Sequence, residues 1–530
     1  MELILGFRTK SLKWLTSFAL LIVVSIVSTY CILVTLTNTF AINTDSLAPF
    51  EQYKLISSGL GKNLLDIHLA RIPSLFPDLA LTATIHQIFP YNGNLDNLSK
   101  YIWGKLFILI LATSSLLFVI NRGKNNVSLE AARIGLIIFA LTNSTLSARK
   151  ALGLAIMPAH HGGNTINTML LFLLVTKLIE QPKSIGYAIS CFILTIFAVS
   201  SNKLILFTGI GPTLILLLLV FKTSKKSAAL IFGLITASGI GILFESFLNT
   251  QCSPKLSIEP LRFIQAIPTY LQFGWIPIVT TLLALVSLLL VIGDIVAGTD
   301  PNLSKKAGVA LISLSALSFY IYIPLITGSF GSHIRYLVTV YWLAPIFFCL
   351  YLDPIFNRIK INSLLIPMLA AAFSFLSPLR SSIRTYAFWP KELILTHIQE
   401  HKFQKPFYAA TRFLKNHGYD AYAGFGDFWS SGITMISNGE IEITPIRPSG
   451  QGDFWATSPQ TVKNNLKKAN KSKVYIFSIN KQFSDQLIKN FGTPEKDWHY
   501  NPKFNMYQDS DLDYNTSQAY GVRLSDARIL

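Results

Sequence analysis

Carboxylates follow the first long apolar run of this sequence at a short distance. Asp45 and Glu51 lie in the stretch AINTDSLAPFEQYKLI, which begins at Ala41, and Asp78 follows Pro77 further along. A carboxylate accepts a proton from a hydroxyl or amine within hydrogen-bond reach, or binds a divalent cation that neutralises phosphate. Each acid also has a simpler interpretation. Asp45 and Asp78 suit the N-caps of helices that would follow them, and Glu51 suits the surface of a helix.

Two histidines form a second polar group. His160 and His161 are adjacent, and Gly162 and Gly163 follow them just before another apolar run. Adjacent side chains point in different directions on a helix, so such a pair rarely ligates one metal ion through helical spacing. In a loop flanked by glycine they could donate hydrogen bonds to a phosphate. The alternative is that they are polar residues at a water interface.

Cations lie at the ends of two later apolar runs. Lys203 lies in SSNKLILF, His333 and Arg335 lie in GSHIRYLVTVYW, and Arg71 lies in the same segment as the acids. Arginine binds phosphate with a planar bidentate fork, and lysine binds it as a point charge. The simpler interpretation is that these side chains extend to anionic headgroups. Taken together, the acids, histidines and cations suit a site for a phosphate-linked lipid and a hydroxyl acceptor.

The elements that must position these residues are apolar. Of the 530 residues, 51% are hydrophobic and only 14% are charged, whereas soluble proteins carry roughly a quarter charged residues. Apolar runs of about 18 to 24 residues are long enough to cross a bilayer as helices, and the sequence predicts about eleven of them. They lie at 14–37, 102–120, 129–147, 164–180, 184–200, 204–221, 227–248, 273–296, 307–326, 335–352 and 361–379.

Short basic loops predict the orientation of these spans. The loops are NRGKN at 121–125, QPK at 181–183, FKTSKK at 221–226, LSKK at 303–306 and NRIK at 357–360. They share one side with the N-terminal cations Arg8, Lys10 and Lys13, and the positive-inside rule places that side in the cytoplasm. An odd number of spans then places the loop 38–101 and everything after about residue 380 outside. The first run is longer than a signal-peptide core and no cleavage site follows it, so we expect an uncleaved first span.

The composition changes near Pro378. Beyond it, DAYAGFG predicts a strand that enters a Gly-rich turn, and EIEITPI and KVYIFSI predict further strands. FWSSGITMIS and SDQLIKNFG predict short helices. The final ~20 residues lack periodicity, which predicts disorder. The predicted fold class is therefore a polytopic α-helical membrane protein. Its transmembrane domain spans 1–380 and includes the outer loop 38–101, and a small exterior α/β domain spans 381–530.

Charge and cysteine content exclude several other classes. The net charge of +18 is distributed over short loops, without a long basic run that interleaves aromatic residues, which argues against nucleic-acid binding. The four cysteines are scattered and form no CxxC pair, so they predict neither a metal cluster nor a disulfide framework. They are Cys31, Cys191, Cys252 and Cys349.

The motifs and the architecture resemble the GT-C class of glycosyltransferases. HIRYL at 333–337 is similar to an H-x-R-Y pattern near a late span in that class, and NTDSL and RIPSLFPDLAL look like its acid-bearing first-loop motifs. These enzymes of bacterial envelopes use polyprenyl-phosphate sugars, and they include mannosyl-, arabinosyl- and galacturonosyltransferase-like proteins. The likeness in architecture covers nearly the whole chain.

The resemblance implies roles for the candidate residues. Asp45 would be the catalytic base or the acid that orients the acceptor, and Asp78 a second acid of the site. Lys203 and Arg335 would hold the donor phosphate, and the remaining substrate-binding residues would be Glu51, Arg71, His160, His161 and His333. The implied reaction is an inverting transfer of a sugar from a polyprenyl-phosphate donor to a glycan, lipid or protein acceptor. It would take place at the outer face of a bacterial inner membrane, and the use of a divalent cation stays open.

Two other classes of function stay open beside the enzyme. A transporter or flippase for a lipid-linked saccharide predicts charged residues within spans and paired broken helices. The predicted spans carry little charge at their centres, which favours the enzyme. A non-catalytic scaffold, whose exterior domain binds a partner, predicts that the outer polar residues do not gather in space.

Overall fold

The computed structural model describes the helices and strands of the chain and a few residues beside them. The described residues are 2–35, 49, 52–53, 56–57, 73–88, 97–121, 126–144, 161–220, 225–248, 275–297, 303–326, 338–358, 364–376, 424–426, 443–445, 474–478, 489, 497–500 and 517–522.

The chain divides into two compact units. The helical unit comprises Met1–Leu36, Gly104–Glu245 and Pro254–Ala387. The second unit comprises Thr37–Trp103, Ser246–Ser253 and Phe388–Leu530. The second unit thus groups the loop that follows the first helix with the C-terminal segment, whereas the predicted transmembrane domain included that loop.

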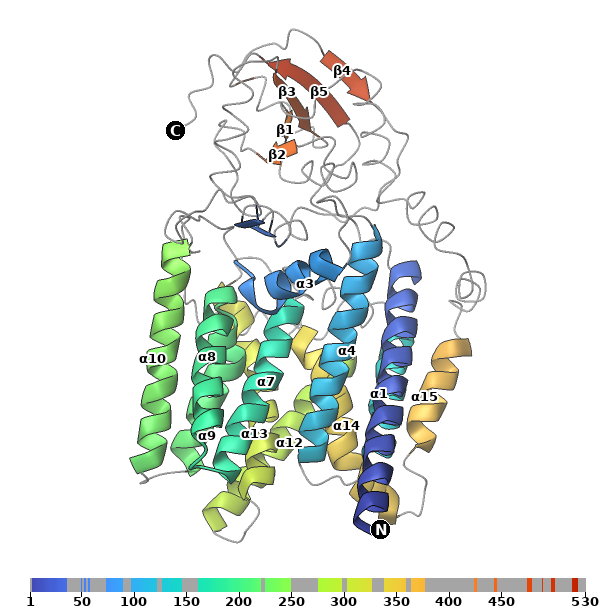
Figure 1. The fold of residues 1–530 in the computed structure, drawn as a ribbon, viewed down its shortest axis with the longest axis vertical. Helices are drawn as coiled ribbons and strands as arrows, with labels where there is room; N and C mark the ends of the chain where they lie inside the picture. Colours follow the sequence, from blue (N-terminus) through green and yellow to red (C-terminus); the bar gives the residue numbers. More distant parts are fainter. Residues whose placement is uncertain are drawn as a thin grey trace. The chain divides into compact units, whose positions relative to one another are not determined.

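Helices make up most of the described residues, and each predicted apolar segment overlaps one of them (Figure 1). A long apolar segment becomes a helix in a bilayer because only a helix satisfies all its backbone hydrogen bonds internally. The helices are α1 (Glu2–Thr35), α4 (Asn97–Asn121), α5 (Val127–Ser144), α7 (His161–Glu180), α8 (Ile185–Ser201), the π-helical turn η3 (Leu206–Ile210), α9 (Gly211–Val220), α10 (Lys225–Leu248), α12 (Trp275–Ala297), α13 (Leu303–Ile326), α14 (Val338–Arg358) and α15 (Leu365–Leu376).

Four helical stretches among the described residues are long and apolar enough to cross a membrane. They are Ser11–Thr29, His161–Glu180, Ala228–Leu248 and Ile276–Asp294. The protein is therefore a helix-rich, membrane-embedded protein, as the composition predicted. The predicted number of about eleven spans stays a prediction.

The side chains of these helices form an apolar exterior and an interior with many small hydroxyl groups. Leu15, Phe232 and Leu289 are 66%, 71% and 60% exposed. Such a surface is unfavourable in water and suits a hydrocarbon solvent. Inside, the Thr142 hydroxyl donates to the carbonyl of Ile138 at 2.7 Å. This bond back to the preceding turn satisfies a hydroxyl where no water is present.

Helix α5 packs closely against α1. A Cβ atom added to Gly135 would lie 2.9 Å from Cγ2 of Val24, so the glycine allows the two backbones to approach. Close approach at small residues gives membrane helices the van der Waals contact on which their association depends. At the start of α5, Arg133 and Glu130 form a buried ion pair at 2.7 Å, which keeps both charges compensated inside the unit.

The second unit contains a five-stranded mixed sheet with the order β2-β1-β3-β5-β4. Its strands are β1 (Gly424–Gly426), β2 (Ile443–Pro445), β3 (Val474–Ser478), β4 (Asp497–Tyr500) and β5 (Ser517–Val522). Strand β1 pairs in parallel with β2 and β3, and β5 pairs antiparallel with β3 and β4. The central position of β3 explains its nearly continuous apolar sequence, VYIFS.

The strands predicted from EIEITPI and KVYIFSI are confirmed as β2 and β3. In DAYAGFG, strand β1 lies on Gly424–Gly426, which were predicted as the Gly-rich turn after a strand, and the preceding residues 420–423 lie outside the described residues. The helix predicted at FWSSGITMIS lies outside the described residues, and only Lys489 of the helix predicted at SDQLIKNFG is described. The prediction of disorder in the final residues is wrong over Ser517–Val522, which form β5. This strand has little pattern of its own, and its order comes from pairing with β3 on one side and β4 on the other.

We expect Gly135→Leu to destabilise the helical unit, because the new side chain overlaps Val24 and forces α1 away from α5. Overpacking of this kind costs about 1–3 kcal/mol. Thermal unfolding of the purified protein in micelles measures the effect. Gly293→Leu on α12 is the matched control, since a Cβ there meets nothing within 4 Å. The additional change Val24→Ala should restore part of the stability, and equal unfolding temperatures for both glycine variants would contradict the packing described here.

Candidate functional site

The first two turns of α7 are polar and buried. The helix begins at His161 and continues through HGGNTINT. Asn164, Thr165, Asn167 and Thr168 are each at most 2% exposed, and His161 is 9% exposed. Polar side chains inside a candidate membrane span are costly unless they face the interior of a bundle and find partners there.

Hydrogen bonds join these side chains to two other elements. The Asn164 amide nitrogen Nδ2 donates to Oγ1 of Thr208 on η3 at 3.1 Å, and the Thr168 hydroxyl lies 3.1 Å from the same oxygen. The Thr165 hydroxyl lies 2.7 Å from Oγ1 of Thr339 on α14. We call these five residues the buried polar cluster. It ties α7, η3 and α14 together.

One acceptor of this cluster has no donor among the described residues. Oδ1 of Asn164 is buried, and no hydrogen-bond partner reaches it within the described part of the chain. Buried polar atoms nearly always have a partner, so an open acceptor marks a place where a donor from outside the described residues would be stabilised. A hydroxyl group or a water molecule would supply that donor.

His161 is the predicted site residue that lies beside the buried polar cluster. It occupies the first turn of α7, and its backbone carbonyl accepts a hydrogen bond from the Thr165 hydroxyl at 3.1 Å. The helix N-terminus carries partial positive charge, which favours an anionic ligand. Its neighbour His160 lies outside the described residues.

Lys203 lies in the short turn between α8 and η3. The Asn202 side chain shapes this turn by accepting a hydrogen bond from the Leu204 amide at 3.0 Å. The ammonium group of Lys203 lies 2.8 Å from a carboxylate oxygen of Glu245 on α10. The lysine side chain is 38% exposed and the glutamate 9%, so the pair lies at the edge of the helical unit. A phosphate at Lys203 would share the lysine with Glu245.

Asp78 lies in the second unit and is buried, at 3% exposure. It belongs to the π-helical turn η2 (Leu75–Leu79), which continues directly into α3 (Ala80–Ile88). Pro73 precedes this turn and Pro77 lies within it, and Ser74 adopts the left-handed conformation at φ 46°. Ser74 is the N-cap residue of this turn, so Asp78 lies inside it.

The Asp78 backbone accepts a hydrogen bond from the Thr82 hydroxyl at 2.9 Å, which fixes the junction of the turn and the helix. Burying a carboxylate is costly unless its environment compensates the charge.

Six predicted site residues lie outside the described residues. They are Asp45, Glu51, Arg71, His160, His333 and Arg335. Their predicted roles stay predictions, as does the gathering of acids, histidines and cations in one outer cavity. Among the residues that the structure describes, no group of three or more His, Cys, Asp or Glu side chains could hold a metal ion.

The buried polar cluster itself was not predicted from the sequence. Its signal was present in the polar residues of NTINT within an apolar segment, because polar residues in a membrane span are costly and need partners. Its hydroxyl and amide groups donate and accept hydrogen bonds but do not transfer protons readily near neutral pH. The cluster can therefore bind and orient a hydroxyl-rich group or join three helical elements, but it supplies no general base.

We expect Thr208→Val to destabilise the helical unit by about 1–2 kcal/mol, because it leaves the amide of Asn164 without its acceptor. The exposed Thr16 provides the control, since its hydroxyl bonds the carbonyls of Leu12 and Lys13 in its own helix. Thermal unfolding of Thr208→Val and Thr16→Val in the same micelles measures the difference. If both variants unfold at the same temperature, the buried polar cluster does not join the helices.

No protein-family model matches the chain, and no curated protein is significantly similar to it. Its function is therefore inferred from its own residues.

Proposed function

We propose that this chain is an integral-membrane glycosyltransferase. It would move a sugar from a polyprenyl-phosphate donor to a glycan, lipid or protein acceptor at the outer face of a bacterial inner membrane. The observation that carries the proposal is the buried carboxylate of Asp78, 3% exposed, in the loop predicted to meet a lipid-borne donor. A carboxylate is the group that such a reaction requires near the acceptor hydroxyl.

The proposed topology has about eleven spans, with the N-terminus in the cytoplasm and a C-terminal α/β domain in the periplasm. It is supported by the composition of the second unit. That unit groups Thr37–Trp103, Ser246–Ser253 and Phe388–Leu530. The alternation of spans predicts that all three segments lie on the same side of the membrane. Segments that form one compact unit must lie on the same side, so the grouping agrees with this prediction.

The proposed reaction is a single displacement. The acceptor hydroxyl attacks the anomeric carbon, Asp45 takes its proton, and the bond between that carbon and the phosphate oxygen breaks on the opposite face. Polyprenyl phosphate leaves with the bonding electrons. Lys203 and Arg335 stabilise the charge of the leaving phosphate, because cations placed where charge develops lower the barrier. Asp78 is the second acid of the site, and Glu51, Arg71, His160, His161 and His333 bind the substrates.

Transport or flipping of a lipid-linked saccharide is the second candidate, and the buried polar cluster favours it. A hydrogen-bonding group inside a candidate span, with an open acceptor at Asn164, suits a polar cargo within the bilayer. The two functions differ in product. An enzyme forms a new glycosidic bond in a detergent solution that has no compartments, whereas a flippase changes only the side on which the lipid is found.

We expect Asp45→Asn to lower sugar transfer by about 100-fold or more, since an amide cannot act as a base. We expect Asp78→Asn to lower transfer as well, because it removes the charge of the second acid. Membranes containing the protein, supplied with radiolabelled polyprenyl-phosphate sugars, provide the assay. Asp294→Asn is the control, because Asp294 is 46% exposed and pairs with Lys306. Thermal unfolding of each variant separates lost catalysis from lost folding. Normal transfer by a folded Asp45→Asn protein would remove Asp45 from the mechanism.

The proposed orientation predicts where single cysteines react. In a chain with its four native cysteines replaced, Lys489→Cys should react with a membrane-impermeant maleimide in intact spheroplasts, whereas Lys183→Cys should react only after the cells are opened. Both side chains are exposed, so access depends on the side of the membrane. Labelling of both positions from outside would contradict the orientation.

A further inference from the structure

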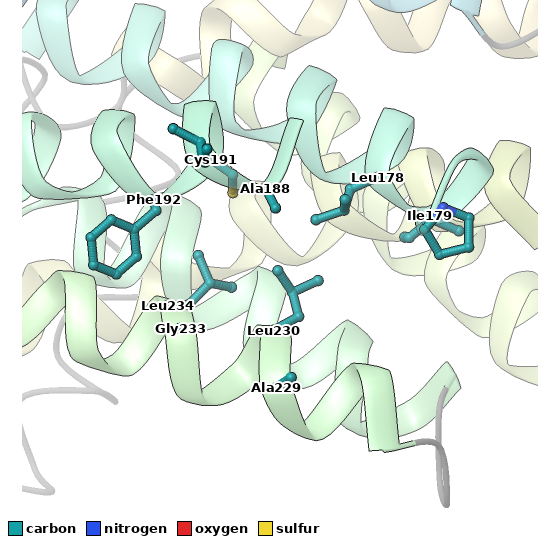
Figure 2. A pocket seen from close by; sticks show the side chains of 11 residues that line it. Leu178, Ile179, Ala188, Cys191, Phe192, Ala229, Leu230, Gly233 and Leu234 are labelled. Carbon is teal, nitrogen blue, oxygen red and sulfur yellow. The ribbon is translucent and has the colours of Figure 1, made fainter. Parts of the chain in front are cut away.

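An apolar groove lies between α8 and α10, and the end of α7 also lines it (Figure 2). Its volume is about 470 Å³. Leu178 comes from α7, Ala188 and Phe192 from α8, and Leu230 and Leu234 from α10. Figure 2 shows the side chains of the two helices facing each other across it.

One end of the groove is closed by direct contact between the helices. A Cβ atom added to Gly241 would lie 2.8 Å from the carbonyl oxygen of Ile196 and 2.8 Å from Cβ of Val199, so α10 touches α8 there. One turn further, Lys203 and Glu245 form their ion pair at 2.8 Å. The two helices are therefore held together at this end.

The helices separate toward the other end. A Cβ atom added to Gly233, which lines the groove, would meet nothing within 4 Å. At Gly241 the two helices are thus too close for a methyl group to fit between them, whereas at Gly233 the space is open. The groove is the volume that this separation creates.

The groove opens toward the bilayer. On α10, Phe232 and Ile235 are 71% and 54% exposed, and on α8, Ile185 and Ile189 are 74% and 52% exposed. Helix α10 contains one of the candidate membrane spans, so these side chains face hydrocarbon. An apolar space of this size would forfeit van der Waals contacts if empty and offers water no polar partners. A flexible hydrocarbon chain fits it best.

Positive charge lies at the open end. Pro182 lines the groove there, and the next residue, Lys183, is exposed. Helix α10 begins with Lys225 and Lys226, one turn before the lining residue Ala229. Anionic headgroups bind such juxtamembrane lysines, whereas zwitterionic headgroups gain less.

The carboxylate nearest to this end in the sequence does not compete for Lys183. Glu180 pairs with Lys177 at 2.8 Å. We propose that the groove holds an acyl chain of an anionic phospholipid, with the headgroup phosphate at Lys183 and the start of α10. The site does not depend on the proposed function. Under the proposed topology it lies in the cytoplasmic leaflet, on the side opposite to sugar transfer.

The test uses the full chain in nanodiscs that contain phosphatidylglycerol with a photoreactive diazirine in its acyl chain. Irradiation should cross-link this lipid to the buried groove residues Cys191 and Leu234, as well as to exposed side chains that face the bilayer. Gly233→Leu fills the groove and should abolish the cross-links at Cys191 and Leu234. Gly239→Leu on the same helix is the control, because a Cβ there also meets nothing within 4 Å and Gly239 does not line the groove. It should keep the cross-links.

Ala188→Phe fills the groove from the α8 side and provides a second variant should Gly233→Leu fail to fold. Persistent cross-links in a folded variant of either kind would overturn the proposal. The headgroup is tested with a phosphatidylcholine probe carrying the same chain. We expect weaker cross-linking than with phosphatidylglycerol, and Lys183→Gln should reduce the difference between the two lipids. Equal cross-linking of both lipids to the unmodified chain would overturn the assignment of an anionic headgroup.

Discussion

The structure depends on one constraint, which is that a bilayer offers no partner to a polar group. Backbone amides and hydroxyls within the helical unit are stabilised by partners inside the protein. Thr142 meets this requirement with a carbonyl of its own helix. Arg133 and Glu130 meet it with each other, and Asn164, Thr168 and Thr208 meet it across two elements. The same constraint explains why apolar side chains can cover the outside of α1, α10 and α12.

Contacts between helices in such a protein come from shape and from polar bonds, since apolar surface alone gives little preference for protein over lipid. Gly135 and Gly241 show the first kind, because each brings two backbones together. The bond from Trp342 on α14 to the Ser115 hydroxyl on α4, at 3.1 Å, shows the second. Near one end, helix α10 has both a close approach to α8 at Gly241 and an ion pair at Glu245. At Gly233 it has neither kind of contact, which explains why a groove lies beside it.

The positions of the helices could be predicted from the sequence because their signal is local, as a run of apolar residues has no other stable form in a bilayer. The sequence signals of strands β2 and β3 were equally local. Strand β5 was missed because its order comes from partners that lie far away in the sequence. The bond between Thr165 and Thr339 joins residues 174 positions apart, so no local pattern contains it. The burial of Asp78 likewise depends on packing that PDLAL does not specify.

The composition of the second unit has a consequence for synthesis. Its first segment ends at Trp103, and its last begins at Phe388. At roughly 5–20 residues per second, the ribosome needs roughly 15 to 60 s to cover the interval. For that time the early segment, with η2 and α3, has no C-terminal sheet to complete its unit. The cell must insert the intervening helices before the last strands exist. The segment that carries Asp78 is therefore synthesised early, whereas the unit to which it belongs is completed only at the end of synthesis.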